Sequence, residues 1–452
     1  MLAYLSDLKE YYSSGETLSY AFRIEQLKKF KLVLKQNERA LIQALAEDLN
    51  KPEFEAYSGE IALLYKEIDY MIKNLKQWIK PEHVLSSIIS FYATSYTVYV
   101  PRGVVLIIAP WNYPVQLLFN PLIGSIAAGN CSVLKPSEYN SAVNRIIKKI
   151  ILEAFPANYV WLCEGDGKTV IEELLANYRF NYVFFTGSTQ VGKSIAVTCG
   201  QNLIPYTLEL GGKSPAIVDN NVDLVLAARR IAWGKFFNAG QICVAPDYVL
   251  VHESIKPKFI ETLTKILNKF YVNANKDMAK IININRFNKL ISYLAQGQII
   301  YGGSYNQEKL QIMPTLIDEP GLNAPIMQEE IFGPILPIIS YHNNEQLKKI
   351  IARNPDPLAL YVFSKNKQFI DDVIKEISFG GGCVNSSLVH ITNLKLPFGG
   401  VMSSGSGAYH GKSSFTTFSH QKSIVNMSTA VDANLKYPPY SRFKNWIIRK
   451  II

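Results

Sequence analysis

Residues 181–194 read NYVFFTGSTQVGKS, and the order of residue types in this stretch decides the fold. The apolar run from Asn181 to Thr186 predicts a short buried strand. A glycine turn follows it and opens a predicted helix. Free N–H groups and the positive end of the helix dipole make such a helix start a binding site for phosphate. The stretch therefore predicts a phosphate-binding turn at the end of a strand.

Further apolar runs lie on both sides of this stretch and alternate with helical segments. They are GVVLIIAP at 103–110, PAIVD at 215–219 and DYVLVHE at 247–253. Strands that are apolar throughout are buried on both faces, as in a parallel sheet covered by helices. Residues 1–80 carry apolar positions at helical spacing, whereas the alternating residues at 96–100 predict a strand. The sequence therefore predicts an α/β protein, and it contains no internal repeat.

The composition limits the class of protein. A chain of 452 residues exceeds one ordinary core, and 48% hydrophobic with 19% charged residues indicates a folded chain. No apolar run approaches the roughly 20 residues of a membrane span, and the N-terminus does not resemble a secretory signal. Five scattered cysteines and six scattered histidines predict neither a disulfide framework nor a metal site. We expect a reducing, cytoplasmic location and no bound metal.

Positive charge is concentrated at the C-terminus. The net charge is +10, and residues 421–452 hold six basic residues and one acid, hence +5. The segment WIIRKII, which begins at Trp446, mixes apolar residues with cations, as interfacial segments do. A solvated basic tail is one interpretation, and weak contact with an anionic membrane surface is the other. We expect no nucleic-acid partner.

Gly187 to Ser194 also satisfies the P-loop pattern G-x-x-x-x-G-K-[ST]. Taken alone, this match predicts a nucleotidase in which Lys193 contacts the phosphates. A partner acid for magnesium is not evident, since Asp219 is the nearest candidate. An ordinary strand-to-helix turn without a ligand is the other alternative.

Several further segments favour a different function. They are APWNYP at 109–114, KPSE at 135–138, LELGGKSP at 208–215, FFNAGQICVAP at 236–246, QEEIFGP at 328–334, SFGGGCVNSS at 378–387 and LPFGGV at 396–401. Together with FTGSTQVG at 185–192, they resemble the aldehyde dehydrogenase superfamily, and the short N-terminus and the spacing resemble its class 3 branch. The resemblance covers about residues 20 to 425. Met402 departs from it, because glycine often follows PFGGV in the family.

The resemblance implies an NAD(P)-dependent oxidation of an aldehyde to an acid, with Cys243 as the nucleophile. A thiolate that adds to the carbonyl gives a tetrahedral adduct, and hydride loss then leaves a thioester. The side-chain amide of Asn112 and the N–H of Cys243 would stabilise the oxyanion. Glu209 would activate the water that hydrolyses the thioester. Without the resemblance, the sequence favours a buried core cysteine at position 243 and a capping or salt-bridged glutamate at position 209. Asn112 can be a turn residue and an oxyanion donor at once.

The same resemblance implies how NAD or NADP binds. Gly187 and Gly192 would let the pyrophosphate approach the helix, and Ser188 would cap it and hold a phosphate oxygen. Lys135 would reach the adenosine ribose, where Glu138 is compatible with a preference for NAD. Further contacts implied near the nicotinamide are Trp111, Glu330 with the ribose hydroxyls, and Phe332; Glu329 is the less favoured ribose ligand.

The resemblance also implies the division of the chain. Residues 1–208 would form a Rossmann-like cofactor domain, interrupted by flap strands near 90–101. Residues 209–416 would form an α/β catalytic domain, 417–430 a strand of a small β oligomerisation flap, and 431–452 the basic tail. Exposed strand edges favour association, so we expect a homodimer. We expect long-chain or aromatic aldehydes as substrates.

Overall fold

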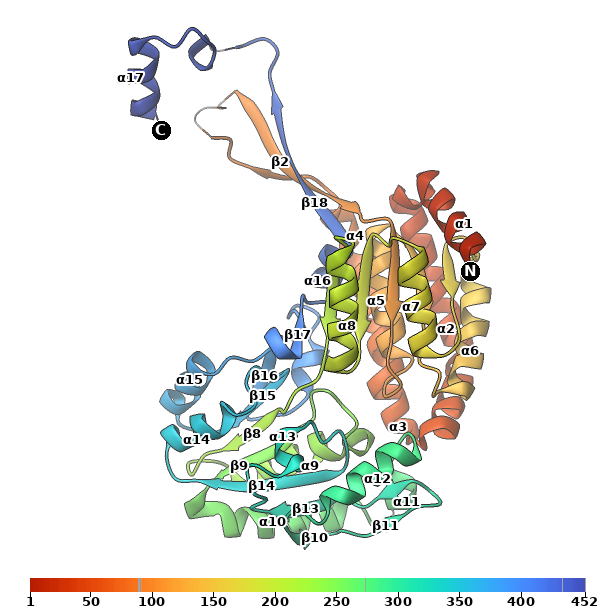
Figure 1. Cartoon of the computed structure of the whole chain (residues 1–452), viewed down its shortest axis with the longest axis vertical. Helices are drawn as coiled ribbons and strands as arrows, with labels where there is room; N and C mark the ends of the chain where they lie inside the picture. Colours follow the sequence, from red (N-terminus) through yellow and green to blue (C-terminus); the bar gives the residue numbers. More distant parts are fainter. Residues whose placement is uncertain (88–89, 91, 273, 433, 452) are drawn as a thin grey trace.

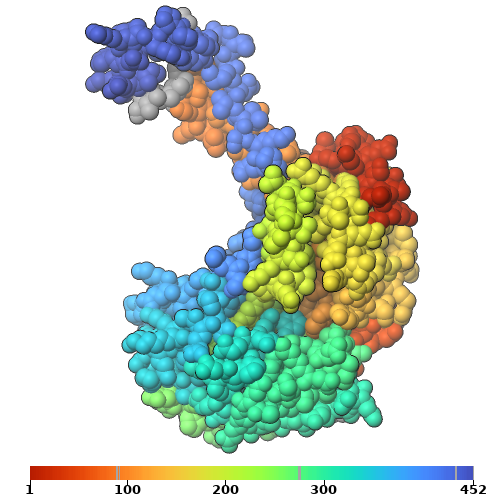
Figure 2. Space-filling model, viewed as in Figure 1, coloured from red at the N-terminus to blue at the C-terminus, as the bar shows by residue number. Residues whose placement is uncertain are grey.

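The computed structural model describes residues 1–87, 90, 92–272, 274–432 and 434–451. Two α/β lobes pack against each other, and a long β arm projects away from them (Figure 1). The C-terminal segment lies at the far end of this arm (Figure 2). The predicted α/β class, with a Rossmann-like cofactor domain and a second catalytic α/β domain, is confirmed.

The first lobe is built on a six-stranded sheet with the order β17-β7-β6-β3-β4-β5. Five of the strands are parallel, and the sixth, β17 (Gly405–Ser406), is antiparallel to β7. The parallel strands are β3 (Val104–Ile108), β4 (Cys131–Lys135), β5 (Val160–Leu162), β6 (Tyr182–Thr186) and β7 (Tyr206–Glu209). The strand order reverses between β3 and β6. Ligands bind at the carboxyl ends of strands at such a switch point.

Helices cover both faces of this sheet. α7 (Gly167–Asn177) and α8 (Thr189–Gln201) lie on one face. The other face is covered by α2 (Tyr20–Leu49), α5 (Gln116–Ala128) and α6 (Ser141–Ala154) (Figure 1). The same part of the chain also contains α1 (Leu2–Ser13), the short α3 (Glu53–Ala56), the π-helical turn η2 (Tyr57–Ile61) and α4 (Ala62–Trp78). The two-sided cover explains why the strands are apolar throughout.

The second lobe contains a seven-stranded sheet with the order β10-β13-β14-β9-β8-β15-β16. Only β10 is antiparallel to its neighbour. The strands are β8 (Pro215–Val218), β9 (Tyr248–His252), β10 (Gln298–Tyr301), β13 (Thr315–Asp318), β14 (Ile335–Tyr341), β15 (Ala359–Phe363) and β16 (Gly381–Val384). Its longer helices are α9 (Leu224–Phe236), α10 (Lys256–Phe270), α12 (Ile284–Tyr293), α14 (Asn344–Ile351) and α15 (Lys367–Glu376).

The arm is a three-stranded antiparallel sheet of β1 (Glu82–Val84), β2 (Ala93–Pro101) and β18 (Ser419–Met427). β2 and β18 pair over their whole length, from Pro101 opposite Ser419 to Ala93 opposite Met427. β18 is an edge strand, and most of its residues are exposed. Beyond it, the chain ends in helix α17 (Arg442–Ile451).

The chain returns to the first lobe before residue 416. β17 pairs with β7, and helix α16 (Lys412–Thr417) packs against α5. Tyr409, Phe415 and Phe418 belong to the hydrophobic core of the first lobe. Residue 416, where the sequence predicts the end of the second domain, lies in α16, which packs against the first lobe.

Candidate active site

Two cavities meet at Cys243. One, of about 300 Å³, lies at the carboxyl ends of β3 and β6 and includes the predicted phosphate-binding turn at Gly187 and Ser188. The other, of about 430 Å³, is lined mostly by apolar and aromatic side chains. Cys243, Asn112 and Leu117 line both cavities. The half-buried thiol of Cys243 therefore lies where a ligand in either cavity can reach it.

A strained turn carries this cysteine. Helix α9 ends at Phe236, and three successive residues follow with positive φ: Asn238 and Ala239 at 51°, and Gly240 at 73°. Glycine is required at position 240, because a Cβ there would collide with the carbonyl oxygen of Gly333. Left-handed conformations of residues other than glycine cluster at functional sites, where the surrounding structure stabilises them.

Burial raises the pKa of the Cys243 thiol, and the carboxyls of Glu330 and Glu209 raise it further. The N–H groups of Cys243 and Val244 partly offset this rise. The thiol is thus protonated at neutral pH in the ligand-free protein. A positive charge or a proton acceptor brought close to it would favour the reactive thiolate.

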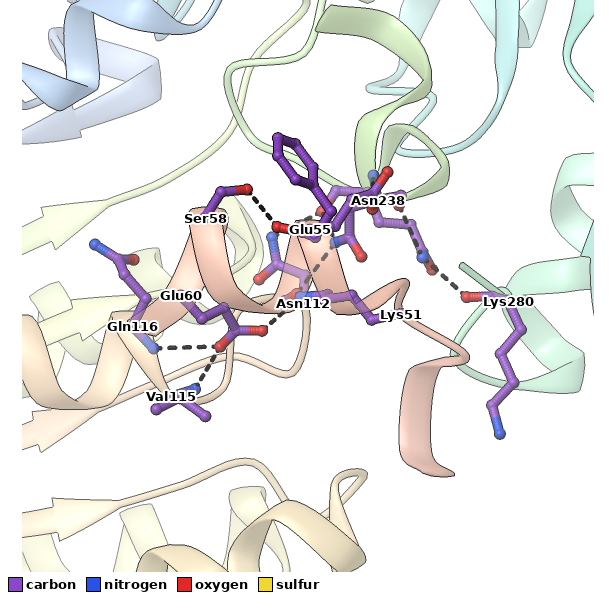
Figure 3. Close-up of polar contacts among 11 residues, drawn as sticks. Lys51, Glu55, Ser58, Glu60, Asn112, Val115, Gln116, Asn238 and Lys280 are labelled. Carbon is purple, nitrogen blue, oxygen red and sulfur yellow. Dashed lines mark hydrogen bonds and ion pairs between the residues drawn. The ribbon is translucent and has the colours of Figure 1, made fainter. Parts of the chain in front are cut away.

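The predicted oxyanion residue Asn112 lies beside this turn and is 3% exposed. Its side-chain nitrogen donates to the carbonyl oxygen of Gln241 over 2.9 Å. Its own carbonyl oxygen accepts from Lys51 Nζ at 3.0 Å and from Asn238 Nδ2 at 3.1 Å (Figure 3). Asn112 is therefore held on both sides by hydrogen bonds.

Glu209 lies at the end of β7 and is 2% exposed. Its backbone oxygen accepts from the N–H of Gly187 at 3.0 Å, which fixes the residue beside the glycine turn. Neither carboxyl oxygen has a hydrogen-bond partner among the described residues, and burial raises the pKa of this carboxyl well above its ordinary value. A buried and unpaired acid of this kind is typical of a proton-transfer group.

The smaller cavity includes a helix start of the kind that binds phosphate. Ser188 caps α8 by accepting from the N–H of Val191 at 3.4 Å, so the helix start faces the cavity. A Cβ at Gly192 would lie 2.6 Å from the Leu210 side chain, so the helix packs closely there. Among the predicted contacts, those that line this cavity are Trp111, Gly187, Ser188, Glu330 and Phe332. Lys135, the last residue of β4, and Glu138, which follows the strand, lie outside this lining, and Lys135 Nζ lies 3.5 Å from the Glu138 carboxylate.

The nicotinamide-side residues form one wall of the cavity. The rings of Trp111 and Phe332 meet edge to face with centroids 5.4 Å apart. Glu330 lies against Gly211, where its carboxylate would collide with any Cβ. Burial raises the pKa of Glu330 to about 8, and Asp247 adds to the rise. Glu329 is exposed and forms an ion pair with Lys289, which accounts for it without a ligand.

The P-loop interpretation is wrong. Helix α8 already begins at Thr189, so residues 189–194 are helical and do not form a loop that could wrap around phosphates. Lys193 is exposed on the outer surface of that helix and does not line the cavity. Within the described residues, no group of three or more His, Cys, Asp or Glu side chains could hold a metal ion.

The sequence motifs did not predict most of the larger cavity. Its lining comes from segments far apart in the chain, among them Phe54 and Gly59, Trp233 and Phe237, and residues 388–410. No Lys, Arg, Asp or Glu contributes to this lining within the described part of the chain. Burial lowers the pKa of His410 to about 4, so its ring is neutral at the cavity wall. Met402 is exposed and lies outside the lining.

A cavity at a helix start and a sheet switch point, joined to an apolar cavity through a cysteine, is the arrangement expected of a nicotinamide-dependent dehydrogenase. The chain belongs to the aldehyde dehydrogenase family, because the model described as "Aldehyde dehydrogenase family" matches residues 8–424. It is an NAD(P)-dependent aldehyde dehydrogenase, and the nucleotidase alternative is set aside.

Similar proteins support the assignment. The chain is 46% identical to the 4,4'-diaponeurosporen-aldehyde dehydrogenase of Staphylococcus aureus, over 97% of this chain and 96% of that protein. It is 41% identical to the "Aldehyde dehydrogenase, dimeric NADP-preferring" of Rattus norvegicus, over 95% and 96% of the two chains. Its structure resembles the substrate-bound state of Staphylococcus aureus AldH, with a TM-score of 0.97, 44% identity, and coverage of 100% and 99%.

Proposed function

We propose that Cys243 is the nucleophile that takes the aldehyde through a thiohemiacetal to a thioester. The observation that carries this proposal is that Cys243 lines both the dinucleotide cavity and the apolar cavity. Its sulfur adds to the carbonyl carbon of an aldehyde in the apolar cavity. NAD(P)+ bound in the other cavity supplies the hydride acceptor.

Asn112 stabilises the oxyanion that this addition creates. One hydrogen of its side-chain nitrogen binds Gln241, and the second remains to donate toward the cavity. The N–H of Cys243 is the other donor. Donors fixed before the reaction need no reorganisation, and removal of one costs about 3 kcal/mol in rate.

Glu209 acts as the base for thioester hydrolysis. Its carboxylate takes a proton from the attacking water, so the products are a carboxylic acid and a free Cys243. Burial suits this role, because it raises the pKa of the carboxyl toward the range in which a base works.

Cofactor contacts follow the geometry of the smaller cavity. Gly187, Ser188 and Gly192 hold the pyrophosphate at the start of α8, while Glu330, Phe332 and Trp111 hold the nicotinamide end. Lys135 and Glu138 contact the adenosine ribose from the end of β4. Initial rates measured with NAD and with NADP distinguish the two cofactors.

The test of the nucleophile is Cys243→Ala. It should abolish aldehyde-dependent reduction of NAD(P)+ while leaving cofactor binding, followed by fluorescence, unchanged. Cys199→Ala is the matched control, because this buried cysteine lies on α8 and lines neither cavity. Full activity of Cys243→Ala would refute the assignment.

The substrate is a long apolar aldehyde. The uncharged lining of the larger cavity favours an alkyl, aromatic or isoprenoid chain, and a 46% identical relative is named for 4,4'-diaponeurosporen-aldehyde. Each buried methylene contributes about 0.8 kcal/mol, so kcat/KM should rise roughly fourfold per carbon until the cavity is filled. A series from butanal to hexadecanal, with benzaldehyde and a phosphorylated aldehyde as controls, measures this. A flat series would contradict the proposal.

The domain division, the oligomeric state and the cellular location belong to the same proposal. The cofactor domain and the catalytic domain divide near residue 208. The arm of β2 and β18 acts as an oligomerisation flap in a homodimer. One relative is named as dimeric. The location is cytoplasmic, which agrees with five cysteines that are all free. Separation of cell fractions and the mass of the protein in solution test the last two features.

A second candidate function is weak contact with an anionic membrane surface, made by the C-terminal tail. α17 carries exposed Phe443 and Trp446, whose rings stack with centroids 6.5 Å apart, among four cations. Helices of this composition lie in the interface and do not cross it. None of the described helices is long and apolar enough to cross a membrane.

A further inference from the structure

A group of buried charges lies directly behind the proposed oxyanion residue. It comes from residues 51–60, which include α3 and all but the last residue of η2 and belong to none of the sequence motifs above. Lys51 and Glu60 form an ion pair of 2.5 Å in which both side chains have no exposed surface. Glu55 is 8% exposed and lies one helical turn before Glu60 (Figure 3). Burying two charges and a third carboxyl is unfavourable unless their hydrogen bonds are well satisfied.

The Lys51–Glu60 pair holds both ends of the segment that begins at Asn112. Lys51 Nζ donates to the Asn112 carbonyl oxygen at 3.0 Å and lies 4.1 Å from the centre of the Tyr113 ring. Glu60 accepts from the N–H of Val115 at 2.8 Å and of Gln116 at 3.3 Å, at the start of α5 (Figure 3). The main chain of Asn112 is therefore fixed from outside the cavity.

Glu55 holds the strained turn before Cys243. Its carboxylate accepts from the backbone N–H of Asn238 at 2.9 Å, which is the first of the three residues with positive φ. The Asn238 side chain then donates to the carbonyl oxygens of Asn112, at 3.1 Å, and of Gln241, at 3.2 Å. Two segments more than a hundred residues apart are thus joined through one asparagine.

We propose that Lys51, Glu55 and Glu60 form a clamp that sets the position of the Asn112 amide relative to Cys243. These are positioning residues, since none of them needs to touch the substrate. The clamp deepens the proposed function and rests on it: an oxyanion site acts only when its donors are aimed before the reaction. A small displacement of Asn112 or of the turn slows thiol addition without changing cofactor binding.

Glu55 offers a graded test. Glu55→Gln keeps an oxygen acceptor for Asn238 at the same distance, and burial already raises the pKa of Glu55 to about 7, so an uncharged analogue is a close substitute. Glu55→Asp withdraws the acceptor by one methylene, and Glu55→Leu removes it. Glu53→Leu, an exposed glutamate in α3, is the matched control.

The readout separates positioning from folding. The fraction of intact sites is counted by labelling Cys243 with iodoacetamide, and the single-turnover rate of cofactor reduction is expressed per labelled site. We expect Glu55→Leu and Glu55→Asp to lower this rate at least tenfold, with the Kd for NAD(P)+ unchanged, and Glu55→Gln and Glu53→Leu to stay within threefold of wild type.

A wild-type rate per labelled site in both Glu55→Asp and Glu55→Leu would overturn the clamp, even if fewer sites were intact. If Glu55→Leu gives no folded protein, Glu55→Asp alone decides. Failure of the proposed function is a separate result: the wild type itself would reduce no cofactor with any aldehyde. In that case the variants are compared by the rate at which iodoacetamide alkylates Cys243, because this reaction needs no turnover.

Discussion

Two carboxyl groups, Glu209 and Glu330, line the cavity that reaches Cys243, and burial raises the pKa of both. Their surroundings differ. Glu330 lies near Arg286 and Lys213, which oppose the rise of its pKa, whereas Glu209 has no hydrogen-bond partner among the described residues. The unpaired carboxyl suits proton transfer, and the partly compensated one suits a fixed contact with ribose hydroxyls.

Glu209→Gln therefore should leave the first half of the reaction intact. We expect a burst of reduced cofactor equal to the enzyme concentration, followed by a steady-state rate 10²–10⁴-fold lower, since an amide cannot accept the proton of water. In the wild type the deacylation rate should rise with pH as the carboxyl ionises, and in the variant it should be flat. Rapid-mixing absorbance measures both phases.

Glu330→Gln is the comparison for this experiment. It should raise the KM for NAD(P)+ and leave deacylation close to wild type. Loss of the burst in Glu209→Gln would show that Glu209 acts before hydride transfer, contrary to the role proposed for it.

At the scale of elements, α4 and the segment before α16 are joined by another buried acid. Glu67 on α4 has no exposed surface, and its carboxylate accepts from the N–H of Gly411 at 2.8 Å, next to His410 in the cavity wall. Burial raises the pKa of Glu67 to about 7, and the Gly411 N–H and Ser414 only partly oppose it.

This raised pKa predicts how stability changes with pH. Between about pH 4.5 and 7 the folded chain holds a proton on Glu67 that the unfolded chain has lost, so the free energy of unfolding falls as pH rises through this window. The loss is on the order of 3 kcal/mol at full ionisation. Glu67→Gln keeps the acceptor and should be more stable than wild type at pH 8, with little difference at pH 5. Denaturant unfolding at both pH values measures this, and an equal pH slope in the two proteins would contradict it.

The same elements show what the sequence could predict. The strand, turn and helix at 181–194 follow from local pattern, because an apolar run, a glycine turn and a capping serine act within a few residues. The stretches around Asn112 and Glu209 meet because the parallel strands β3 and β7 end at one edge of the first sheet, whereas Cys243 comes from the turn between α9 and β9 in the second lobe. Resemblance to a family, more than spacing, singled out these three residues.

Residues 51–60 could not be predicted to lie at the site. KPEFEAYSGE has the composition of a solvated helix, and nothing local indicates that Lys51 and Glu60 are fully buried. The same holds for residues 388–410, whose contribution to the cavity depends on the return of the chain to the first lobe through β17. Contacts between distant segments decide both cases, and the sequence of either segment alone does not contain them.

For the whole molecule, the arm is the feature that a lone subunit does not explain. β18 leaves one edge without a partner strand among the described residues, and Val425 and Met427 are exposed on it. Unpaired edges favour association. We expect a homodimer with twice the chain mass of 50.9 kDa, and Val425→Asp with Met427→Asp should shift it to the monomer in sedimentation equilibrium. Lys365→Asp, on the surface of the second lobe, is the control, and a wild type that is monomeric would exclude this role of the arm.

The C-terminal tail has the composition of a segment that contacts an anionic membrane surface. α17 lies beyond the arm, far from both cavities, and presents Phe443 and Trp446 at 67% and 59% exposure beside Arg442, Lys444, Arg449 and Lys450. Aromatic rings enter the headgroup region while cations attract anionic lipid, and each cation near such a surface contributes about 1 kcal/mol at low salt. The protein should therefore co-sediment with vesicles that contain anionic lipid, and high salt should release it.

Removal of residues 431–452 should abolish that binding and leave the oxidation of a short, water-soluble aldehyde within twofold of wild type, because none of the residues described in this segment lines either cavity. Phe443→Ser with Trp446→Ser should weaken binding at constant charge, which separates insertion of the rings from attraction of the cations. Equal binding to neutral and anionic vesicles would contradict the electrostatic part. Unchanged binding after truncation would move the contact to another surface. If the substrate is a long apolar aldehyde, tail-dependent binding should also lower its apparent KM when it is presented in anionic vesicles, since the enzyme and its substrate then share one surface.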